Sequence, residues 1–525
     1  MITKIYNSVK WGVRGALIPL ILMSCSLEEN PRDQISEEEA YTTPQALYLN
    51  TVATLYNYIG GCEDGQGLQG TCRGIYDLQT FGSDEAILPT RSADWYDGGI
   101  WQDLYRHTWD AGHPLLNNSW LYLYKVITLC NRSIEQIEAH QEMIDQQARA
   151  IYTAEVRALR AICYWYLLDL FGRVPILTST HASMNDVKQS ERAEVFDFVE
   201  KELLQSCAFI PDGKSANSGD SYGRVTLPVV YFVLAKLMLN AQVYTGTPRW
   251  EDCIDYCDRI ERKGYRLETD YTANFAVHNE TSVENIWIIP MNRELYRNQQ
   301  QNIIRSLHYR HAAIYGYGGE NGSCAPPHIM KIFGYGTDEQ DARLDMNYWT
   351  GVVEDPMYGL ATDRTGAPLV YYPMEVDMDI SGSPYVETAG ARMKKYEIDK
   401  NALQDGKLTE NDIVLFRFAD VLLMRAEAKF RCGQDGQADF DAVRNRVGMA
   451  PRPITLKDLL DERLMELCWE GWRRQDLIRF NKYESLFQGD IFKLKVNESD
   501  GHTRLFPIPA AVIALNRNLK QNNGY

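Results

Sequence analysis

The sequence predicts a mainly α-helical protein in which tetratricopeptide-like helical pairs support an irregular, loop-rich portion. Apolar residues recur at spacings of three and four over much of the chain, which is the period of an amphipathic helix. Two of these runs end at Gly172 and Gly433, and glycine supplies the left-handed residue that ends many helices. Between residues 286 and 400 the period gives way to Gly, Pro and Tyr, which predicts loops carried on a helical frame.

The helical pair predicted for residues 227–267 is the clearest of these elements. Thr245-Gly246-Thr247-Pro248 separates two apolar runs, and the small residues Ala235 and Ala241 allow facing helices to approach closely. Within the loop-rich portion, the apolar run 286–289 predicts a short strand. The segments with helical period are 40–58, 116–137, 148–171, 195–207, 227–244, 253–260, 413–431 and 456–480.

The N-terminal stretch predicts export. Lys4, Lys10 and Arg14 precede an apolar run over residues 16–23, which is the layout of a signal peptide. The run is well short of the roughly 20 residues that a membrane-spanning helix needs. We therefore expect residues 1–24 to direct secretion rather than to cross a membrane.

The residues that follow predict a lipid anchor. Leu22-Met23-Ser24-Cys25 looks like a bacterial lipobox, in which the thiol of Cys25 receives a lipid before cleavage. The acids Glu28 and Glu29 resemble the export signal of surface lipoproteins in Bacteroidetes. We expect Cys25 to tether the chain to an outer membrane, on its outward face.

Charge excludes one class of partner. The 525 residues carry a formal net charge of -17. Binding to a phosphate backbone needs a basic surface, so we expect no nucleic-acid partner. The length allows a large core and two to four domains.

Cysteine and histidine patterns do not indicate a catalytic or structural transition metal, and we expect no cofactor. There is no C-x-x-C pair, and the nine histidines show no ligand spacing. Cys62 and Cys72 bracket a Gly-rich loop, so a disulfide is plausible in an exported chain, but its connectivity stays open. Residues 377–382 copy the first half of a Ca²⁺-binding EF-hand loop, yet position twelve is Thr388, which leaves a Ca²⁺ site open against a solvated turn.

Aromatic side chains are the unusual feature of the sequence, with 32 Tyr and 11 Trp. Rings at helical spacing are expected in the core: Trp101, Tyr105 and Trp109. Trp95, Tyr96, Tyr315 and Tyr317 instead lie among Gly and Asp, where rings can stay exposed and offer flat apolar faces to a ligand. Exposed aromatic rings also occur at interfaces with partner proteins, so the sequence leaves open whether these rings contact a ligand or a protein.

Sugars suit such rings, because pyranose C–H faces stack on them while hydroxyl groups need fixed polar partners. The nearest polar candidates in the sequence are Asp84, Arg91, Asp94 and Asn321. Asp84 and Glu85 could also form a glycosidase pair, although adjacent side chains point apart and hydrolysis needs two carboxyl groups facing one bond. The acids and arginines of segment 456–480 are at helical spacings that favour structural ion pairs.

Several motifs resemble the SusD/RagB family. The most characteristic are C-terminal: Asp461 to Arg479, Leu505-Phe506-Pro507-Ile508-Pro509 and Gln521-Asn522-Asn523-Gly524-Tyr525. Others are Glu155 to Tyr166 with Phe171-Gly172-Arg173-Val174-Pro175, Arg417 to Glu427, and Arg444-Asn445-Arg446-Val447-Gly448. Asn523 stands where the family usually has Pro, and Ala510-Ala511 where an acid is common. The motifs follow the family's order from the lipobox to the last residue.

The resemblance implies a SusD-like fold with an N-terminal helical part, residues 25–270, and a C-terminal part, residues 271–525, that includes the loop-rich segment 286–400. It also implies a surface lipoprotein that holds glycans and closes over a partner TonB-dependent outer-membrane transporter, without catalysis. Segment 83–99 matches a family region near the ligand face, which favours Asp84, Arg91, Trp95 and Tyr96 as ligand contacts. Tyr315, Tyr317 and Asn321 complete the expected binding set.

Two alternatives stay open on the sequence. One is a surface glycoside hydrolase or lyase that uses Asp84 or Glu85. The other keeps the fold but binds a peptide in place of a glycan.

Overall fold

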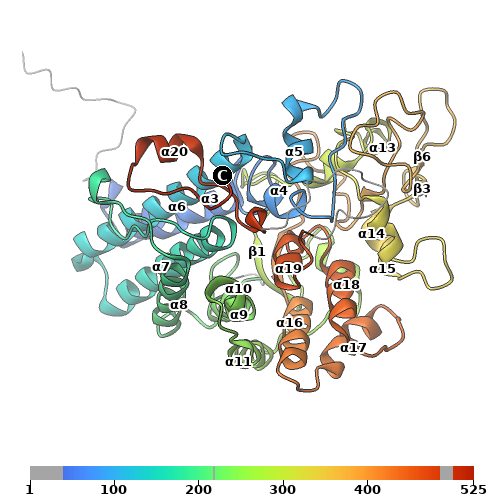
Figure 1. The fold of residues 1–525 in the computed structure, drawn as a ribbon. Coiled ribbons are helices and arrows are strands. Elements are labelled where there is room, and N and C mark those ends of the chain that lie inside the picture. The colour runs from blue at the N-terminus through green and yellow to red at the C-terminus, as the bar shows by residue number, and fades with distance from the viewer. Residues whose placement is uncertain (1–39, 217–218, 485–500) are drawn as a thin grey trace, which may run out of the picture.

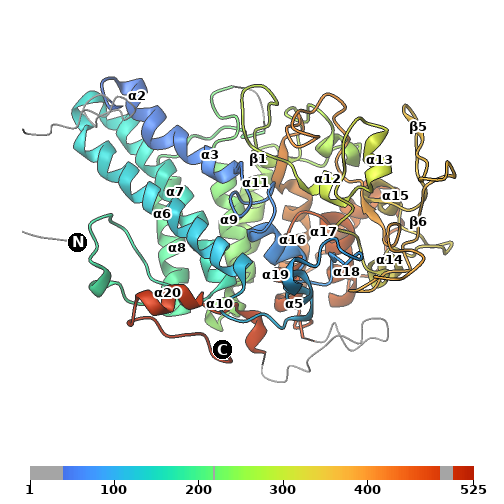
Figure 2. The ribbon, with the colours of Figure 1, turned by 90° about the horizontal axis from the view of Figure 1, so that it is seen from above.

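The structure is a computed structural model that describes residues 40–216, 219–484 and 501–525. Within these ranges the chain is mainly helical, as the sequence predicts. Long helices gather on one side of the molecule, and loops with short strands occupy the other (Figure 1). The view from above shows the same division (Figure 2). Cys25 and the expected signal peptide lie outside the described residues.

The helical side is a row in which each helix packs on the next one in the chain, and this confirms the predicted tetratricopeptide-like pairs. Helices α17 and α18 then pack on the last member of the row. The row consists of α6 (Pro114–Ala139), α7 (Gln146–Leu170), α8 (Arg192–Cys207), α9 (Leu227–Leu239), α11 (Trp250–Glu261) and α16 (Phe418–Arg431).

Shorter helical segments connect and extend this row. Before α6 they are α2 (Pro44–Tyr48), η1 (Leu49–Ala53), α3 (Thr54–Gly60), α4 (Ile75–Thr80), η2 (Asp97–Gly99) and α5 (Ile100–Arg106). Between α6 and α16 they are η3 (Gln141–Met143), η4 (Met184–Asp186), α10 (Ala241–Thr245), η5 (Tyr271–Phe275), α12 (Asn302–Ser306), α13 (Tyr309–Ala313), α14 (Pro327–Ile332) and α15 (Arg343–Asn347). The C-terminal ones are α17 (Gln437–Arg446), α18 (Leu456–Leu467), α19 (Arg473–Arg479), η6 (His502–Arg504) and α20 (Ala510–Leu515).

The loop-rich portion is inserted between two helices that touch. α11 and α16 are neighbours in the row, although the chain between them contains the whole loop-rich portion. Strand β1 (Asn285–Ile289) pairs antiparallel with β8 (Ile413–Arg417), and these strands begin and end that portion. Its other strands form two-stranded ladders: β2 (Tyr348–Trp349) with β7 (Arg392–Met393), β3 (Gly351–Val352) with β6 (Val370–Tyr371), and β4 (Glu354–Asp355) with β5 (Gly359–Leu360).

Two predicted helices were wrong in part. The helix predicted for 413–431 begins only at Phe418, because 413–417 pair with β1 as a fully buried strand. A short apolar run cannot be assigned to helix or strand by its period alone. The helix predicted for 456–480 is two helices, α18 and α19, because Trp469 (φ 65°) and Gly471 (φ 76°) take left-handed backbone conformations between them.

Other local predictions are confirmed. The strand at 286–289 is β1, and Gly172 and Gly433 have the positive φ angles expected of residues that end helices. The three rings Trp101, Tyr105 and Trp109 are buried in the core. One apolar core, spanning Val52 to Ile508 in the sequence, joins the helical side to the loop-rich side. The division at residue 270 stays a prediction.

The plausible disulfide is absent, since Cys62 and Cys72 are both free thiols. Residues 377–382 form a turn in which Asp379 accepts a hydrogen bond from the Ser381 N–H at 3.0 Å. In the part of the chain that the structure describes, no group of three or more His, Cys, Asp or Glu side chains could hold a metal ion.

A buried charge network fastens the loop-rich portion to the helical scaffold. Arg417, the last residue of β8, is fully buried and pairs with Glu284 at 2.8 Å, with Glu466 at 2.5 Å and with Glu470 at 2.9 Å. Glu466 also pairs with Arg343 of α15 at 2.9 Å and with Arg446 of α17. Burial would raise the pKa of Glu466, but Arg446, Arg417 and Arg343 hold it well below its ordinary value. The structural role expected for the charged residues of 456–480 is confirmed for Glu466. Its ion-pair partners, however, lie outside that segment, at Arg343, Arg417 and Arg446.

A second buried contact joins residues 84–85 to the turn between α18 and α19. Asp84 pairs with Arg473 at 2.7 Å, and Glu85 accepts a hydrogen bond from the Trp469 N–H at 2.5 Å. Burial would raise the pKa of Asp84, but Arg473 and His328 hold it below its ordinary value. Burial does raise the pKa of Glu85, to about 8, although the Trp469 N–H favours the charged form.

Replacing Arg417 with Met should lower the free energy of unfolding by about 3–5 kcal/mol, because three buried carboxylates would lose their shared cation. Urea denaturation monitored by circular dichroism measures this change. The matched control is Arg259→Met, which removes an exposed pair with Asp255 and should cost less than about 0.5 kcal/mol. Equal effects of the two substitutions would contradict a central role for Arg417.

Glu85 should make stability depend on pH. Its pKa is about 8 in the folded chain against an ordinary value of 4.5, so between these values the folded state keeps a proton that the unfolded state has released. Its contribution is therefore fully present below pH 4.5 and is lost as the pH rises through 8. Urea titrations from pH 5 to pH 9 should show a flatter pH dependence for Glu85→Gln than for the native chain. Parallel curves would show that the carboxyl group ionises normally.

Candidate functional site

A left-handed loop precedes α5 and presents the sequence-predicted aromatic pair. Ser92 (φ 59°), Trp95 (φ 61°) and Asp97 (φ 42°) all have positive φ angles, which non-glycine residues rarely adopt. Gly98 and Gly99 follow with φ of 71° and 89°. Such clustered strain persists only where surrounding contacts enforce it, and it is concentrated at functional sites.

The contacts that hold this loop come from distant segments. The indole N–H of Trp95 donates to the Glu320 carbonyl at 2.8 Å, and the Tyr309 hydroxyl donates to Asp94 at 2.6 Å. The Trp95 ring lies against Gly322, where an added Cβ would be 2.7 Å from a ring carbon. Trp95 is therefore fixed and half-buried.

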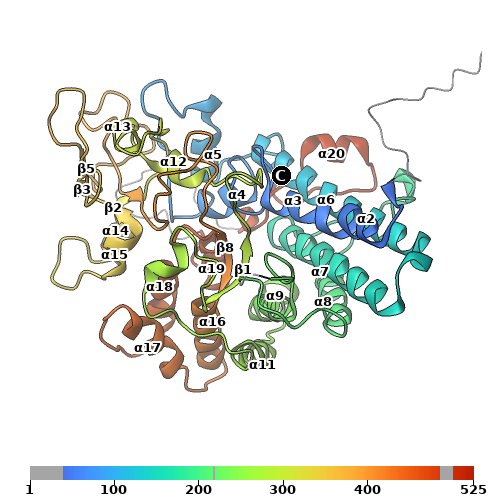
Figure 3. The same ribbon diagram turned by 180° about the vertical axis from the view of Figure 1, so that it is seen from behind.

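Tyr96 is the exposed neighbour of this fixed ring. Its side chain is 54% exposed, and Asp94 beside it is also exposed. We call Asp94, Trp95, Tyr96 and Tyr309 the Trp95 surface. It lies where the loop before α5 reaches the start of α13, which Figures 1 and 3 show between α5 and the short strands.

Three predicted contact residues lie beneath the surface. Asp84 is 2% exposed and paired with Arg473, as described above. Arg91 is buried, and its guanidinium donates to the carbonyls of Val386 at 2.8 Å and Ala389 at 2.9 Å. Burial lowers the pKa of Arg91 to about 9. Asn321 is 1% exposed and has φ of 49°. All three side chains are therefore too buried for direct contact with a ligand.

Tyr315 and Tyr317 lie beyond the other end of α13. The Tyr315 hydroxyl donates to Asp355 at 3.0 Å, and that of Tyr317 donates to the Asp399 carbonyl at 2.5 Å. Tyr315 is 7% exposed, whereas Tyr317 is half-buried. The structure thus brings Trp95 and Tyr96 together and places the two tyrosines apart from them.

Tyr309 was missing from the expected binding set. It belongs to the run of tyrosines in the loop-rich portion, which is the sequence signal that could have pointed to it. Its hydrogen bond to Asp94 joins residues 215 positions apart, and local sequence does not show such a pairing.

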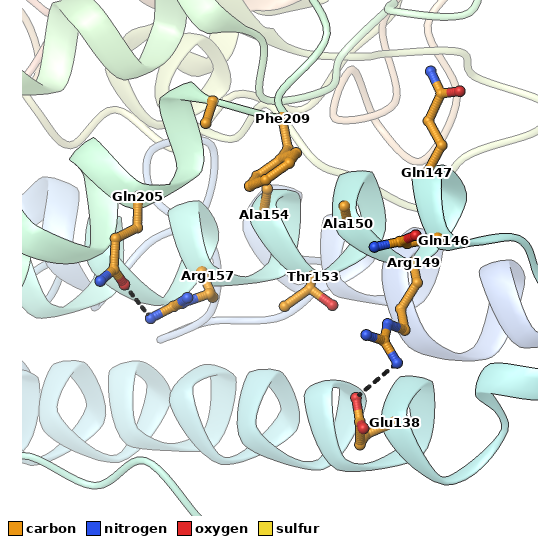
Figure 4. A pocket seen from close by; sticks show the side chains of 11 residues that line it. Glu138, Gln146, Gln147, Arg149, Ala150, Thr153, Ala154, Arg157, Gln205 and Phe209 are labelled. Carbon is orange, nitrogen blue, oxygen red and sulfur yellow. Dashed lines mark hydrogen bonds and ion pairs between the residues drawn. The ribbon is translucent and has the colours of Figure 1, made fainter.

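A cavity of about 1080 Å³ lies on the helical side, between α6, α7 and α8. Figure 4 shows Phe209 over Ala154, with Arg157 hydrogen-bonded to Gln205 at one end and Arg149 paired with Glu138 at the other. Among the described residues that line it, Phe209 supplies the aromatic ring. The remaining lining is mostly polar and offers no second ring beside it, unlike the Trp95 surface.

Two family models match this chain. One, described as the SusD family, matches residues 275–525, and the other, described as starch-binding associating with the outer membrane, matches residues 76–239. The second description associates the family with the outer membrane. Among the described residues, no helix has both the length and the apolar character needed to cross a membrane.

Curated relatives and solved structures agree with these models. The starch-binding protein SusD of Bacteroides thetaiotaomicron is 28% identical over 515 residues, covering 89% of each chain. A SusD-like protein of Bacteroides ovatus is 26% identical over 286 residues, covering 52% of this chain and 48% of the relative.

Among solved structures, a laminarin-binding SusD-like protein has a TM-score of 0.73 at 21% identity, covering 92% of this chain and 100% of its own. Surface glycan-binding protein A of Bacteroides thetaiotaomicron, solved with laminarihexaose, has a TM-score of 0.72 at 19% identity with the same coverage. At these identities the structures establish the shared fold. The two family models and the relative that covers most of this chain show that the chain belongs to the SusD/RagB family.

Proposed function

We propose that this chain is a non-catalytic, lipid-anchored protein that binds glycans on the Trp95 surface. The observation that carries the proposal is the left-handed loop, which holds the Trp95 ring in one orientation and leaves Tyr96 exposed beside it. A fixed aromatic face loses little conformational entropy when a sugar ring stacks on it. Relatives named for binding starch and laminarin support a glucan as ligand.

Polar groups around the two rings suit sugar hydroxyls. Asp94 is exposed and already accepts one hydrogen bond from Tyr309, which fixes its carboxylate while leaving further acceptor positions. Asp84, Arg91 and Asn321 are buried, so we do not propose them as direct contacts. Trp95 and Tyr96 are the proposed direct contacts.

The proposed place of action is the cell surface. The lipobox ending at Cys25 supports a lipid anchor, and the family model's description supports the outer membrane. In this proposal the chain hands its glycan to a TonB-dependent transporter in the same membrane. The resemblance to the SusD/RagB family supports that delivery step.

The hydrolase alternative has less support. Asp84 and Glu85 are both buried, with Asp84 paired to Arg473 and Glu85 bonded to a backbone N–H. A glycosidase needs two carboxyl groups on either side of an accessible sugar bond. A peptide ligand remains an outcome of the binding experiments.

Substituting Tyr96 with Ala should weaken binding of maltohexaose or laminarihexaose by about 1 kcal/mol. This is the free energy that an aromatic contact contributes in addition to the burial of its apolar area. Trp95→Ala should weaken glycan binding more, because it removes the ring that the hydrogen bond to the Glu320 carbonyl holds in place. Isothermal titration calorimetry measures both. Phe209→Ala is the matched control, since Phe209 is also 54% exposed but lies on the helical side. Unchanged glycan affinity in both test variants, or binding of peptides alone, would contradict the proposed surface.

Prolonged incubation with starch and laminarin should leave their chain lengths unchanged, because neither buried carboxyl group can reach a glycosidic bond. Size-exclusion chromatography and reducing-end assays measure this. Shortened products that disappear in Glu85→Gln would establish the hydrolase instead.

A further inference from the structure

A cavity with several aromatic residues in its lining lies in the loop-rich portion, apart from the Trp95 surface. Its volume is about 680 Å³, and it is bordered by the β4–β5 hairpin, by Trp349 at the end of β2 and by the chain that follows β7. We call it the Tyr358 cavity. Its lining is Thr272, Ala276, Tyr315, Asp345, Met346, Trp349, Glu354, Asp355, Pro356, Met357, Tyr358, Lys394, Lys395, Tyr396, Glu397, Ile398 and Lys400.

The rim of the cavity is held in place by one carboxylate. Asp355 accepts hydrogen bonds from the N–H groups of Met357 at 2.8 Å and Tyr358 at 2.9 Å, which shapes the hairpin turn. Its second oxygen accepts the Tyr315 hydroxyl at 3.0 Å. The Tyr358 ring meets the Tyr315 ring edge-on, with centroids 5.1 Å apart. Tyr358 is thus a positioned ring that is still 36% exposed.

Two nitrogen donors in the lining have no hydrogen-bond acceptor among the described residues. The Lys394 ammonium stands 4.4 Å from the centre of the Trp349 ring, and no carboxylate among the described residues pairs with it. Burial lowers the pKa of Lys394, although Asp345 and Asp355 oppose this change. The indole N–H of Trp349 is buried and has no hydrogen-bond partner in the described part of the chain. His311 packs perpendicular to the Trp349 ring at 4.9 Å and fixes it from behind.

The charges of the lining restrict the ligand. Asp345, Glu354, Asp355 and Glu397 contribute four acids, against the three lysines at 394, 395 and 400. Lys395 is already paired with Glu470 at 2.5 Å, so it adds no free positive charge. A uronate or sulfated sugar would meet an excess of carboxylates. Neutral hydroxyl groups can use donors and acceptors together.

We propose that the Tyr358 cavity is a second glycan subsite that takes neutral sugar units, with Tyr358 as the stacking ring and Lys394 as a hydrogen-bond donor. This inference rests on the proposed function, because it assumes a glycan ligand. Helix α13 separates the two sites: Tyr309 at its start bonds Asp94, and Tyr315 beyond its end bonds Asp355. The five residues of α13 span roughly 7.5 Å, so the two sites lie at opposite ends of one short helix. Figures 1 and 3 show α13 between α5 and the short strands.

Stoichiometry with short sugars tests the proposal. Maltotriose and laminaritriose are titrated into the native chain by calorimetry, and we expect two sites per chain for the sugar that binds. Tyr358→Ala and Tyr96→Ala should each leave one site, and the double variant none. Tyr296→Ala is the control, because Tyr296 is 40% exposed but does not line the Tyr358 cavity, and it should leave two sites.

The outcomes separate the two proposals. No glycan binding by the native chain contradicts the proposed function itself. One site that Tyr96→Ala removes and Tyr358→Ala leaves intact overturns the second subsite while the proposed function stands. One site that only Tyr358→Ala removes supports the cavity and overturns the Trp95 surface. Thermal unfolding of each variant shows that the loss is not one of folding.

Two further measurements test the role of Lys394 and the preference for neutral sugars. Lys394→Met should weaken binding at the remaining site of the Tyr96→Ala variant about tenfold, which is the loss expected for a hydrogen bond from a charged donor. In the same background trigalacturonate should bind at least tenfold more weakly than the neutral trisaccharide. Equal or tighter binding of trigalacturonate would overturn the assignment to neutral sugars.

Discussion

The ion pairs of Arg417 are the interaction on which the rest of the structure depends. Arg417 lies at the joint between β8 and α16, where the loop-rich portion returns to the helical row. Its carboxylate partners precede β1, end α18 and occupy the turn before α19, so they meet only when all these segments are in place. A buried charge without its partners is strongly destabilising, and alternative arrangements of these segments are therefore disfavoured. The network sets the position of the loops relative to the helices.

The proposed binding surfaces depend on this frame without being part of it. Arg91 holds the left-handed loop through backbone carbonyls near residue 389, and Trp95 is bonded to the chain at Glu320. The strained backbone is thus supported by segments that the core already fixes. This division lets a loop keep an unfavourable conformation, because the energy comes from contacts elsewhere.

Sequence reasoning predicted the helical row well, because amphipathic period and glycine ends are local properties. It failed at 413–417 and at 468–472, where pairing with β1 and the burial of Trp469 and Glu470 override the local period. The exposure of Tyr96 could be predicted from its Gly and Asp neighbours, whereas a ligand role for Trp95 and Tyr96 stays a prediction. Asp84 could not be placed, because its partner Arg473 is 389 residues away. Tyr358 and Lys394 were not predicted, since a turn around Asp355 and the pairing of β2 with β7 bring them together.

The β4–β5 hairpin stands apart from the main core. Below it, Val353, Ala361, Leu369 and Tyr371 form a small apolar cluster of their own, and Met357 at the tip is 72% exposed. None of the ion pairs around Arg417 involves a hairpin residue. Changes in its length or side chains would therefore alter the proposed sugar contact with little effect on folding. Within a family that shares one scaffold, such a segment is where nutrient preference can diverge most readily.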